Sequence, residues 1–159
     1  IYNAKYSQNF SVRKAKITDI KLIYEWNNDI TTRKNSISES QFDFHEHKKW
    51  FLKSIKNDDL DFFVVIQNGP VGSFRVEKKE NFLISFLVAP EYRGMKIGSK
   101  IISYVINNYV EKNINAYVLE SNLFSQKIFK KYDFKIASKF SKNNKQIIKF
   151  QKNQKNEFI

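Results

Sequence analysis

The stretch FLISFLVAPEYRGMKIGSKIISYV, residues 82–105, decides how the rest of the chain is interpreted. Its first seven residues are apolar, rich in β-branched and aromatic side chains, and end at Ala89-Pro90, which predicts a short buried strand. Further on, Ile101, Ile102 and Val105 recur at helical spacing, so we expect an amphipathic helix over residues 99–110. The segment therefore predicts a strand, a basic glycine-containing turn and a helix.

The turn between this strand and helix has the properties of an anion-binding site. The first amides of a helix have no intrahelical partner, and the helix dipole places partial positive charge there. Glycine allows a ligand to approach the backbone closely, and the turn also carries two basic side chains. Neither common nucleotide motif, G-x-x-x-x-G-K-[ST] or G-x-G-x-x-G, is present, and a plain strand–turn–helix unit of a basic protein is the alternative. We predict a phosphate or diphosphate cradle made of Arg93, Gly94, Met95, Lys96, Ile97, Gly98 and Ser99.

Residues 88–99, VAPEYRGMKIGS, resemble motif A of the GNAT superfamily of N-acetyltransferases, whose signature is [QR]-x-x-G-x-[GA]. Arg93 and Gly98 match this signature, whereas Lys96 stands where the family has its first glycine. Lysine would be strained there if the position needs an unusual backbone dihedral angle. It would be tolerated if only its N–H is needed, and its charge could then help to hold phosphate.

A second segment, residues 122–134 (NLFSQKIFKKYDF), resembles the family pattern N-x-x-S/A-x-x-x-Y/F-x-x-x-G-F. The two resemblances together imply acetyl-CoA as the acyl donor, with its diphosphate on the motif A turn. They also imply that the pantetheine arm lies along the backbone of the strand before the turn and against the later helix. The donor-site residues implied in this way are Leu87, Val88, Ala89, Asn122, Ser125 and Phe129.

Composition limits the classes of protein to which the chain can belong. Its 159 residues fit one domain over residues 1–159, with 1–9 as a lead-in and 153–159 as a tail, and 42% hydrophobic residues favour a packed core. Because the chain begins with Ile, it could also be a domain excised from a longer protein. There is no cysteine, and two histidines without clustered carboxylates predict no metal site. No apolar run is long enough for a membrane span and no secretory signal is visible, so we expect a cytoplasmic protein.

The formal net charge of +12 raises the alternative of a nucleic-acid-binding protein. The lysines are spread along the whole chain, however, with only loose concentrations at Lys130-Lys131 and from Lys139 to Lys155. We therefore do not expect nucleic acid to be the main partner. A basic surface would also attract an anionic small molecule such as coenzyme A or a sugar nucleotide.

The residue patterns along the chain predict a mixed α+β fold. Strands are expected over 10–14, 60–67, 70–77, 82–88, 114–119, 134–138 and 146–151, and helices over 20–27, 46–56, 99–110 and 122–132. Residues 30–44 are expected to form a loop or a short helical turn. This order matches the acyl-CoA N-acyltransferase fold that the resemblance implies, with a mostly antiparallel sheet of six to seven strands and about four helices.

The proton-transfer residues of the family are only partly present. Many members carry a glutamate base on the strand before motif A, where this chain has Leu83, and a tyrosine acid at the position of Phe129. Tyr132, one turn further on, is a candidate substitute for the acid or a structural aromatic residue. Glu46 and His47 are candidates to accept the amine proton, unless both face solvent at a helix start.

The acceptor is suggested by a third resemblance. Residues 26–29 (WNND), Arg33 and the segment E-H-x-x-W-F at 46–51 are similar to acetyltransferases of amino-sugar nucleotides, although Asn27 replaces the usual arginine. The implied acceptor contacts are Trp26, Asn28, Arg33 and Trp50. We thus expect a cytoplasmic N-acetyltransferase that acts on a nucleotide-linked amino sugar. Two alternatives are a protein N-terminal acetyltransferase and a non-catalytic domain that binds coenzyme A.

Overall fold

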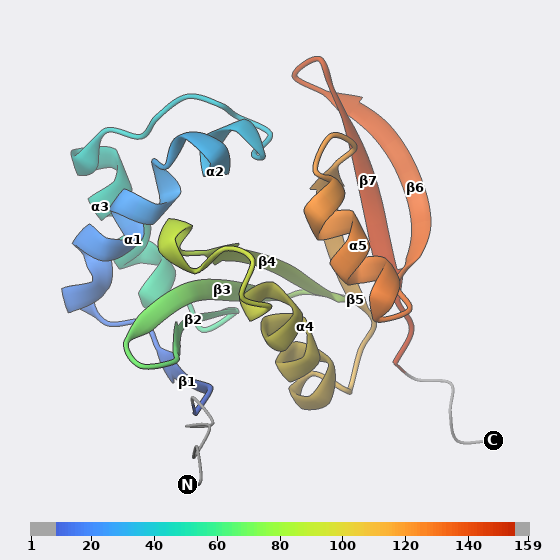
Figure 1. Ribbon diagram of the computed structural model, residues 1–159, viewed down its shortest axis with the longest axis horizontal. Helices are drawn as coiled ribbons and strands as arrows, with labels where there is room; N and C mark the ends of the chain where they lie inside the picture. Colours follow the sequence, from blue (N-terminus) through green and yellow to red (C-terminus); the bar gives the residue numbers. More distant parts are fainter. Residues whose placement is uncertain (1–8, 155–159) are drawn as a thin grey trace, which may run out of the picture.

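The computed structural model describes residues 9–154, which form one seven-stranded sheet with helices on both faces (Figure 1). The strands are β1 (Ser11–Lys14), β2 (Leu60–Ile66), β3 (Pro70–Lys78), β4 (Phe82–Val88), β5 (Ile114–Leu119), β6 (Lys135–Lys142) and β7 (Lys145–Lys152). The helices are α1 (Ile20–Asn27), α2 (Ile30–Lys34), α3 (Phe44–Ile55), α4 (Ile97–Asn108) and α5 (Leu123–Lys131), with 3-10 turns at Ile17–Asp19 and Pro90–Tyr92. No helix within residues 9–154 combines the length and apolar character needed to span a bilayer.

The strand order is β1-β2-β3-β4-β5-β7-β6, and every neighbouring pair is antiparallel except β4 with β5. This confirms the predicted α+β class and the mostly antiparallel sheet. The prediction also gave α1, β4 and β5 with the bounds that the structure shows. These three elements carry clear hydrophobic patterns between polar or proline boundaries, which explains why their ends could be found.

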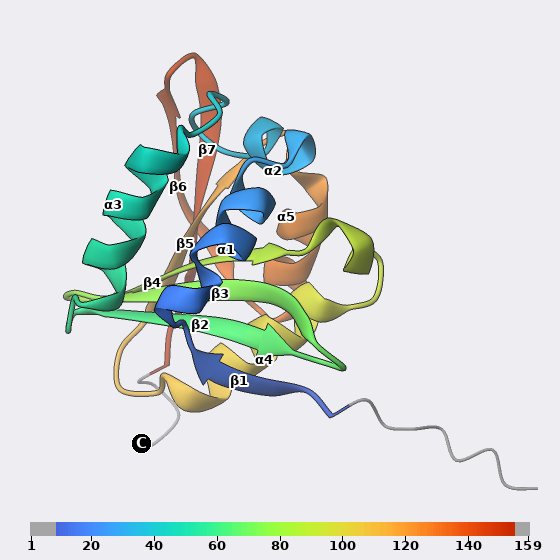
Figure 2. The ribbon, with the colours of Figure 1, turned by 90° about the vertical axis from the view of Figure 1, so that its left-hand side faces the viewer.

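Helices α1 and α3 lie on one side of the sheet and α4 on the other (Figure 2), and a hydrophobic cluster lies on each face. One cluster joins α1 and α3 to the sheet through residues such as Ile23, Phe51 and Val64. The other joins α4 and α5 to the opposite face, where the ring of Phe129 stacks on Phe150 with centroids 5.6 Å apart. The alternation of side chains along each strand therefore sends one set of residues to the α1–α3 face and the next set to the α4–α5 face.

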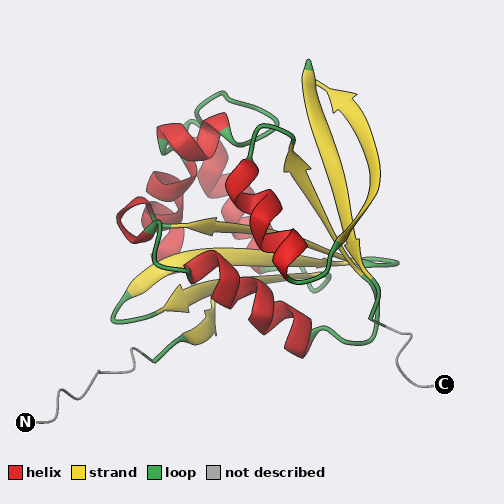
Figure 3. Cartoon of the chain, turned by 45° about the vertical axis from the view of Figure 1, so that its right-hand side comes forward, coloured by secondary structure: helices red, strands yellow, loops and turns green. Residues whose placement is uncertain are grey.

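The sheet opens between its two parallel strands. β4 pairs with β5 only at Phe82↔Ile114 and Leu83↔Asn115, although β4 continues to Val88 and β5 to Leu119. Beyond these two pairs the strands diverge, and the two parts of the sheet separate (Figure 3). The outer part of the sheet, β5–β7, is held together by its own antiparallel pairing. The loss of strand pairing at the opening is therefore confined to β4 and β5.

Most of the other elements differ from the expected boundaries by one or two residues, and two segments differ more. β6 was expected to end at residue 138 but runs to Lys142, and all eight of its residues are exposed, so no burial pattern marks its length. The turn that follows has left-handed φ angles of 52° at Asn143 and 60° at Asn144, as a two-residue hairpin turn requires. Residues 30–44 include the short helix α2, whose start is capped by Asp29 accepting a hydrogen bond from the Thr32 amide at 3.1 Å.

Lys96, the residue that replaces the first motif glycine, adopts the left-handed conformation. It is the N-cap of α4, with φ 63° and ψ 20°, and no side chain caps this end of the helix. A non-glycine residue in this region costs about 1–2 kcal/mol because Cβ approaches the following carbonyl. The position thus does require the dihedral angle that glycine adopts freely, and lysine is strained there.

His47 belongs to the core between α3 and α1. Its side chain is 2% exposed, and its Nε2 donates to the Ile20 carbonyl oxygen at 3.0 Å. The imidazole also packs against the rings of Tyr24, Trp50 and Phe51. Burial lowers the pKa of His47, and the hydrogen bond to Ile20 only partly offsets this effect.

We expect Lys96→Gly to stabilise the fold by up to about 1 kcal/mol, because glycine relieves the left-handed strain while losing more chain entropy on folding. Urea unfolding of the purified protein measures this change. The matched control is Lys127→Gly in the exposed part of α5, which should cost about 1 kcal/mol because its backbone is helical. Equal destabilisation by both substitutions would contradict the strain at Lys96.

We expect His47 to make the protein less stable as the pH falls. Because the folded-state pKa lies below the ordinary value of 6.5, its contribution is fully present above that pH and is lost progressively below it. His47→Gln should cost about 1–3 kcal/mol at pH 7.5 and flatten the loss between pH 7 and 5. Unfolding of this variant is compared with His45→Gln, at an exposed position, which should retain the wild-type pH dependence.

Candidate active site

The divergence of β4 and β5 leads into a cavity of about 390 Å³. Its walls come from both sides of the opening and from the helices on the α1–α3 face. β3 and β4 contribute Arg75, Glu77 and Ser85, β5 contributes Tyr117, and α5 with its N-cap contributes Asn122 and Ser125. A second cavity of about 350 Å³ adjoins it, because Asn27, Arg33, Trp50 and Arg75 line both.

The backbone of β4 offers free hydrogen-bonding groups to this opening at alternate residues. The amide of Phe82 donates to Asn113 on the β5 side, whereas the amide of Ala89 donates to Val71 of β3. Because backbone groups alternate along an antiparallel strand, those of Phe86 and Val88 point toward the opening, where β5 has moved away. Of the three predicted backbone contacts, Val88 therefore has the required orientation, while Leu87 and Ala89 turn toward β3.

The motif A turn lies at the end of β4. Its Arg93 amide donates to Pro90 O at 3.4 Å, and the amides at the start of α4 are open to a ligand. No side chain caps the start of α4, and a Cβ added at Gly94 would meet no atom within 4 Å. Gly98 is different, because a Cβ there would lie 2.8 Å from Ile128 Cδ1. Gly98 thus lets α4 pack against α5, while the amides of the first helical turn remain available for an anion.

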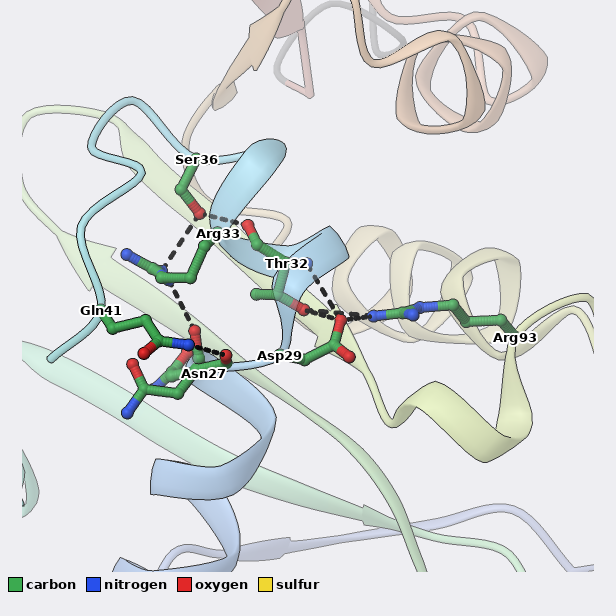
Figure 4. A network of polar contacts seen from close by, with 8 residues as sticks. Asn27, Asp29, Thr32, Arg33, Ser36, Gln41 and Arg93 are labelled. Carbon is green, nitrogen blue, oxygen red and sulfur yellow. Dashed lines mark hydrogen bonds and ion pairs between the residues drawn. The ribbon is translucent and has the colours of Figure 1, made fainter.

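Arg93 reaches from this turn to helix α2 (Figure 4). Its guanidinium forms an ion pair with the carboxylate of Asp29 and donates to Thr32 Oγ1 at 3.2 Å. Burial of Asp29 opposes ionisation, but the bonds from Arg93 and Thr32 outweigh it, so the pKa of this carboxyl is lowered. The predicted diphosphate contact is therefore held by the carboxylate of Asp29, the N-cap of α2, which lies 64 residues earlier in the chain.

The start of α5 forms the opposite side of the opening. Asn122 caps the helix by accepting from the Ser125 amide at 3.2 Å, and its Nδ2 donates to Ser125 Oγ at 3.1 Å. Both residues and Phe129 line the cavity. Phe129 is 2% exposed and contacts the cavity mainly as part of its apolar floor.

Three of the four predicted acceptor residues hold the structure around the cavity. Trp26 is buried in the core and lines neither cavity. Asn28 pins the loop before α3, because its Oδ1 accepts from the Phe42 amide at 2.7 Å. Arg33 lines both cavities, but its guanidinium donates to Asn27 O and Ser36 Oγ (Figure 4) and also to Ser38 O.

Trp50, the fourth predicted acceptor residue, forms an aromatic wall of the cavity. Arg75, a residue that the sequence analysis did not single out, stacks on it. The Arg75 guanidinium lies 5.0 Å from the centroid of the Trp50 ring and 6.0 Å from that of Phe62. The sequence predicts only that Arg75 lies in the strand expected over 70–77. Its position on the same face as Ser73 and Glu77, alternating with buried Phe74 and Val76, was the available signal.

The candidate residues for proton transfer differ in whether they line a cavity. Glu77 lines the main cavity and pairs across β3 and β4 with Leu83, the position where the family pattern has its glutamate. Glu46 is exposed at the rim of the smaller cavity. Tyr132 caps the far end of α5 and lines neither cavity, and the Nε2 of His47 is already bonded to Ile20, so the geometry favours neither for proton transfer. Within residues 9–154, no group of three or more His, Cys, Asp or Glu side chains could hold a metal ion.

Known proteins were compared with this chain by sequence and by structure. No curated protein matches the chain. The spermidine N-acetyltransferase of Vibrio cholerae, solved with CoA and spermine, has a TM-score of 0.81 at 16% identity, covering 93% of this chain and 96% of that one. An N-acetyltransferase from Staphylococcus aureus gives a TM-score of 0.77 at 21% identity, with 92% and 99% covered. A Salmonella typhimurium structure with acetyl-CoA as its cofactor gives 0.76 at 16% identity, with 95% and 97% covered.

At these identities the solved structures establish the fold and no more. The family follows from a separate match: the sequence model of the acetyltransferase (GNAT) family matches residues 20–134. This match spans α1 to the end of α5 and includes both sides of the opening between β4 and β5. The chain belongs to the acetyltransferase (GNAT) family and is an acetyl-CoA-dependent N-acetyltransferase.

Proposed function

We propose that this enzyme transfers the acetyl group of acetyl-CoA to the primary amine of a nucleotide-linked amino sugar. The observation that carries the proposal is the opening between β4 and β5, which joins the motif A turn to a cavity on the α1–α3 face. Donor and acceptor would enter this opening from opposite sides. Such an arrangement places a thioester and an amine together, and positioning supplies much of the catalysis in acyl transfer.

The donor site consists of the α4 amides, Arg93 and the open backbone of β4. The diphosphate of acetyl-CoA would accept hydrogen bonds from the uncapped amides at the start of α4, where the helix dipole favours negative charge. The pantetheine arm would pair with Phe86 and Val88, as an added strand pairs with a sheet edge. Asn122 and Ser125 would face the arm from the other side.

The reaction requires the amine to lose a proton as its nitrogen attacks the thioester carbonyl, while the departing sulfur must gain one. Glu77 is the carboxylate in the wall of the main cavity, so we assign it the amine proton. Tyr117, on the opposite strand and also in the wall, carries a hydroxyl that could protonate the sulfur. Under this assignment, Glu77 and Tyr117 take the roles that the family places at the positions of Leu83 and Phe129.

The acceptor assignment rests on the chemistry of the cavity lining. Sugars are bound by flat aromatic side chains with polar groups beside them, and Trp50, Ser85 and Asn27 supply both. The neighbour from Vibrio cholerae was solved with spermine, which makes a polyamine the second candidate acceptor. A polycation would meet Arg33 and Arg75 in both cavities here, against one carboxylate in each, so the charge balance favours the sugar nucleotide.

We expect Arg93→Met to weaken binding of acetyl-CoA by about 10-fold or more, because a charged hydrogen bond to the diphosphate is lost. The thermal shift with increasing acetyl-CoA measures the change, since a ligand at 100 times its Kd stabilises by about 2.7 kcal/mol. Asp29→Asn is the matched variant, because it breaks the same ion pair but leaves the arginine free. Equal weakening by both variants would mean that Arg93 acts only by holding α2.

We expect Glu77→Gln to lower kcat by about 10²-fold or more without changing the affinity for acetyl-CoA, because the amine proton loses its acceptor. Thiol release is measured with UDP-linked amino sugars, free amino sugars, spermidine and peptides as acceptors. Glu80→Gln, at an exposed position after the same strand, should keep wild-type turnover. A larger loss in Glu46→Gln would transfer the role to Glu46, and preferential turnover of spermidine would overturn the sugar acceptor.

A further inference from the structure

Arg75 differs from the other arginines that face the site. Arg33 uses three hydrogen bonds to build the loop after α2, and Arg93 is paired with Asp29. Within residues 9–154 the Arg75 side chain forms neither a hydrogen bond nor an ion pair within 4.0 Å, and it is half-buried. A guanidinium has five N–H donors, so Arg75 brings unused hydrogen-bonding capacity to the cavity wall.

The surroundings of Arg75 fix its guanidinium without using these donors. The group stacks over Trp50 of α3 and lies near Phe62, its pairing partner on β2. On the other side of β3, the strand partner of Arg75 is Ser85 of β4, which is exposed at the opening. Stacking of this kind leaves the edge of the guanidinium, with its N–H groups, free to bind a planar or tetrahedral anion.

No carboxylate neutralises this charge. Glu77, two residues along the same strand, attracts Arg75 but forms no ion pair with it within 4.0 Å, and its own Oε2 lies 3.0 Å from the Nζ of Lys79. Burial lowers the pKa of Arg75, and Glu77 offsets part of this effect. A half-buried charge without a partner is costly, and the cost is recovered when a ligand supplies the opposite charge.

The position of Arg75 identifies the substrate that would supply this charge. Its side chain is on the α1–α3 face with Ser73, Glu77 and Phe62, whereas the motif A turn leads into α4 on the opposite face. Arg75 lines both cavities, whereas Ser85 and Glu77 line the main one. A group bound there belongs to the acceptor and not to the diphosphate of the donor.

We propose that Arg75 is a specificity-determining residue that binds an anionic group, a phosphate or a carboxylate, on the amine acceptor. This inference rests on the proposed acetyl transfer and extends it to the class of acceptor, which must carry a negative charge near its amine. Arg75 would hold the anion against the Trp50 wall and leave the amine next to Glu77 and the opening. A neutral amine would lack this contact, and a polyamine would be repelled.

The test compares acceptors that share an amine and differ in an anionic group. Galactosamine 1-phosphate with galactosamine probes phosphate, glycine with glycinamide probes carboxylate, and spermidine represents a polycation. For the preferred pair, Arg75→Met should lower the ratio of kcat/KM for the anionic over the neutral acceptor by 10- to 100-fold, as expected for a lost charge-assisted hydrogen bond. The KM for acetyl-CoA should not change, because the donor lies on the other face.

Two further variants separate recognition from other effects. Arg75→Lys keeps the charge but not the paired donors, so it should recover part of the ratio. Lys49→Met removes an exposed charge next to Trp50 on α3 and should leave the ratio unchanged. An unchanged ratio in Arg75→Met, or an equal loss for charged and neutral acceptors, would overturn the inference, since the residue would then act only through its packing.

If no acceptor is acetylated, that result refutes the proposed function alone. A binding experiment still tests the anion site at Arg75 in that case. Trp50 reports on the site by fluorescence, while Trp26 is buried in the core. Galactosamine 1-phosphate or glycine should change this emission in the wild type at concentrations where galactosamine and glycinamide do not, and Arg75→Met should lose the response. No response from either anion in the wild-type protein would overturn the anion site.

Discussion

The structure depends on one constraint, which is that β4 and β5 pair at only two positions before they diverge. A parallel pair needs a long connection, and here α4 supplies it while covering the sheet on one side. The divergence leaves backbone groups of β4 without a strand partner in the middle of the protein. In most sheets such groups would be a defect, because buried amides and carbonyls need partners. Here they become useful when an extended ligand occupies the gap.

Around this gap, polar side chains divide into those that build the walls and those left for a ligand. Arg33 and Asn28 shape the segment between α2 and α3, and their hydrogen-bonding groups are taken up by loop atoms. The ion pair between Arg93 and Asp29 connects the motif A turn to the start of α2. Arg75 remains without such a bond in the described part of the chain. The distinction could not be made from residue type, because all three arginines look alike in a sequence.

The sequence was informative where local patterns determine structure. The run from Phe82 to Val88 and the helix after it follow from apolar spacing, and their placement depends on no distant contact. The departure at Lys96 was also visible, and the left-handed conformation shows which of its two readings holds. By contrast, the burial of His47 is decided by a carbonyl 27 residues earlier, and the cavity position of Glu77 by pairing across strands. Such long-range contacts are not encoded in any local pattern.

The fully exposed strand β6 has a consequence for how this protein behaves among its own copies. An outermost strand offers unpaired backbone groups to any similar edge, which is how sheets extend from one molecule to the next. β6 carries lysines at positions 135, 139 and 142, and a chain of net charge +12 adds repulsion at longer range. Two such edges that meet would bring like charges together along their whole length. The basic character that raises the alternative of nucleic-acid binding would thus also oppose pairing between the β6 edges of two copies.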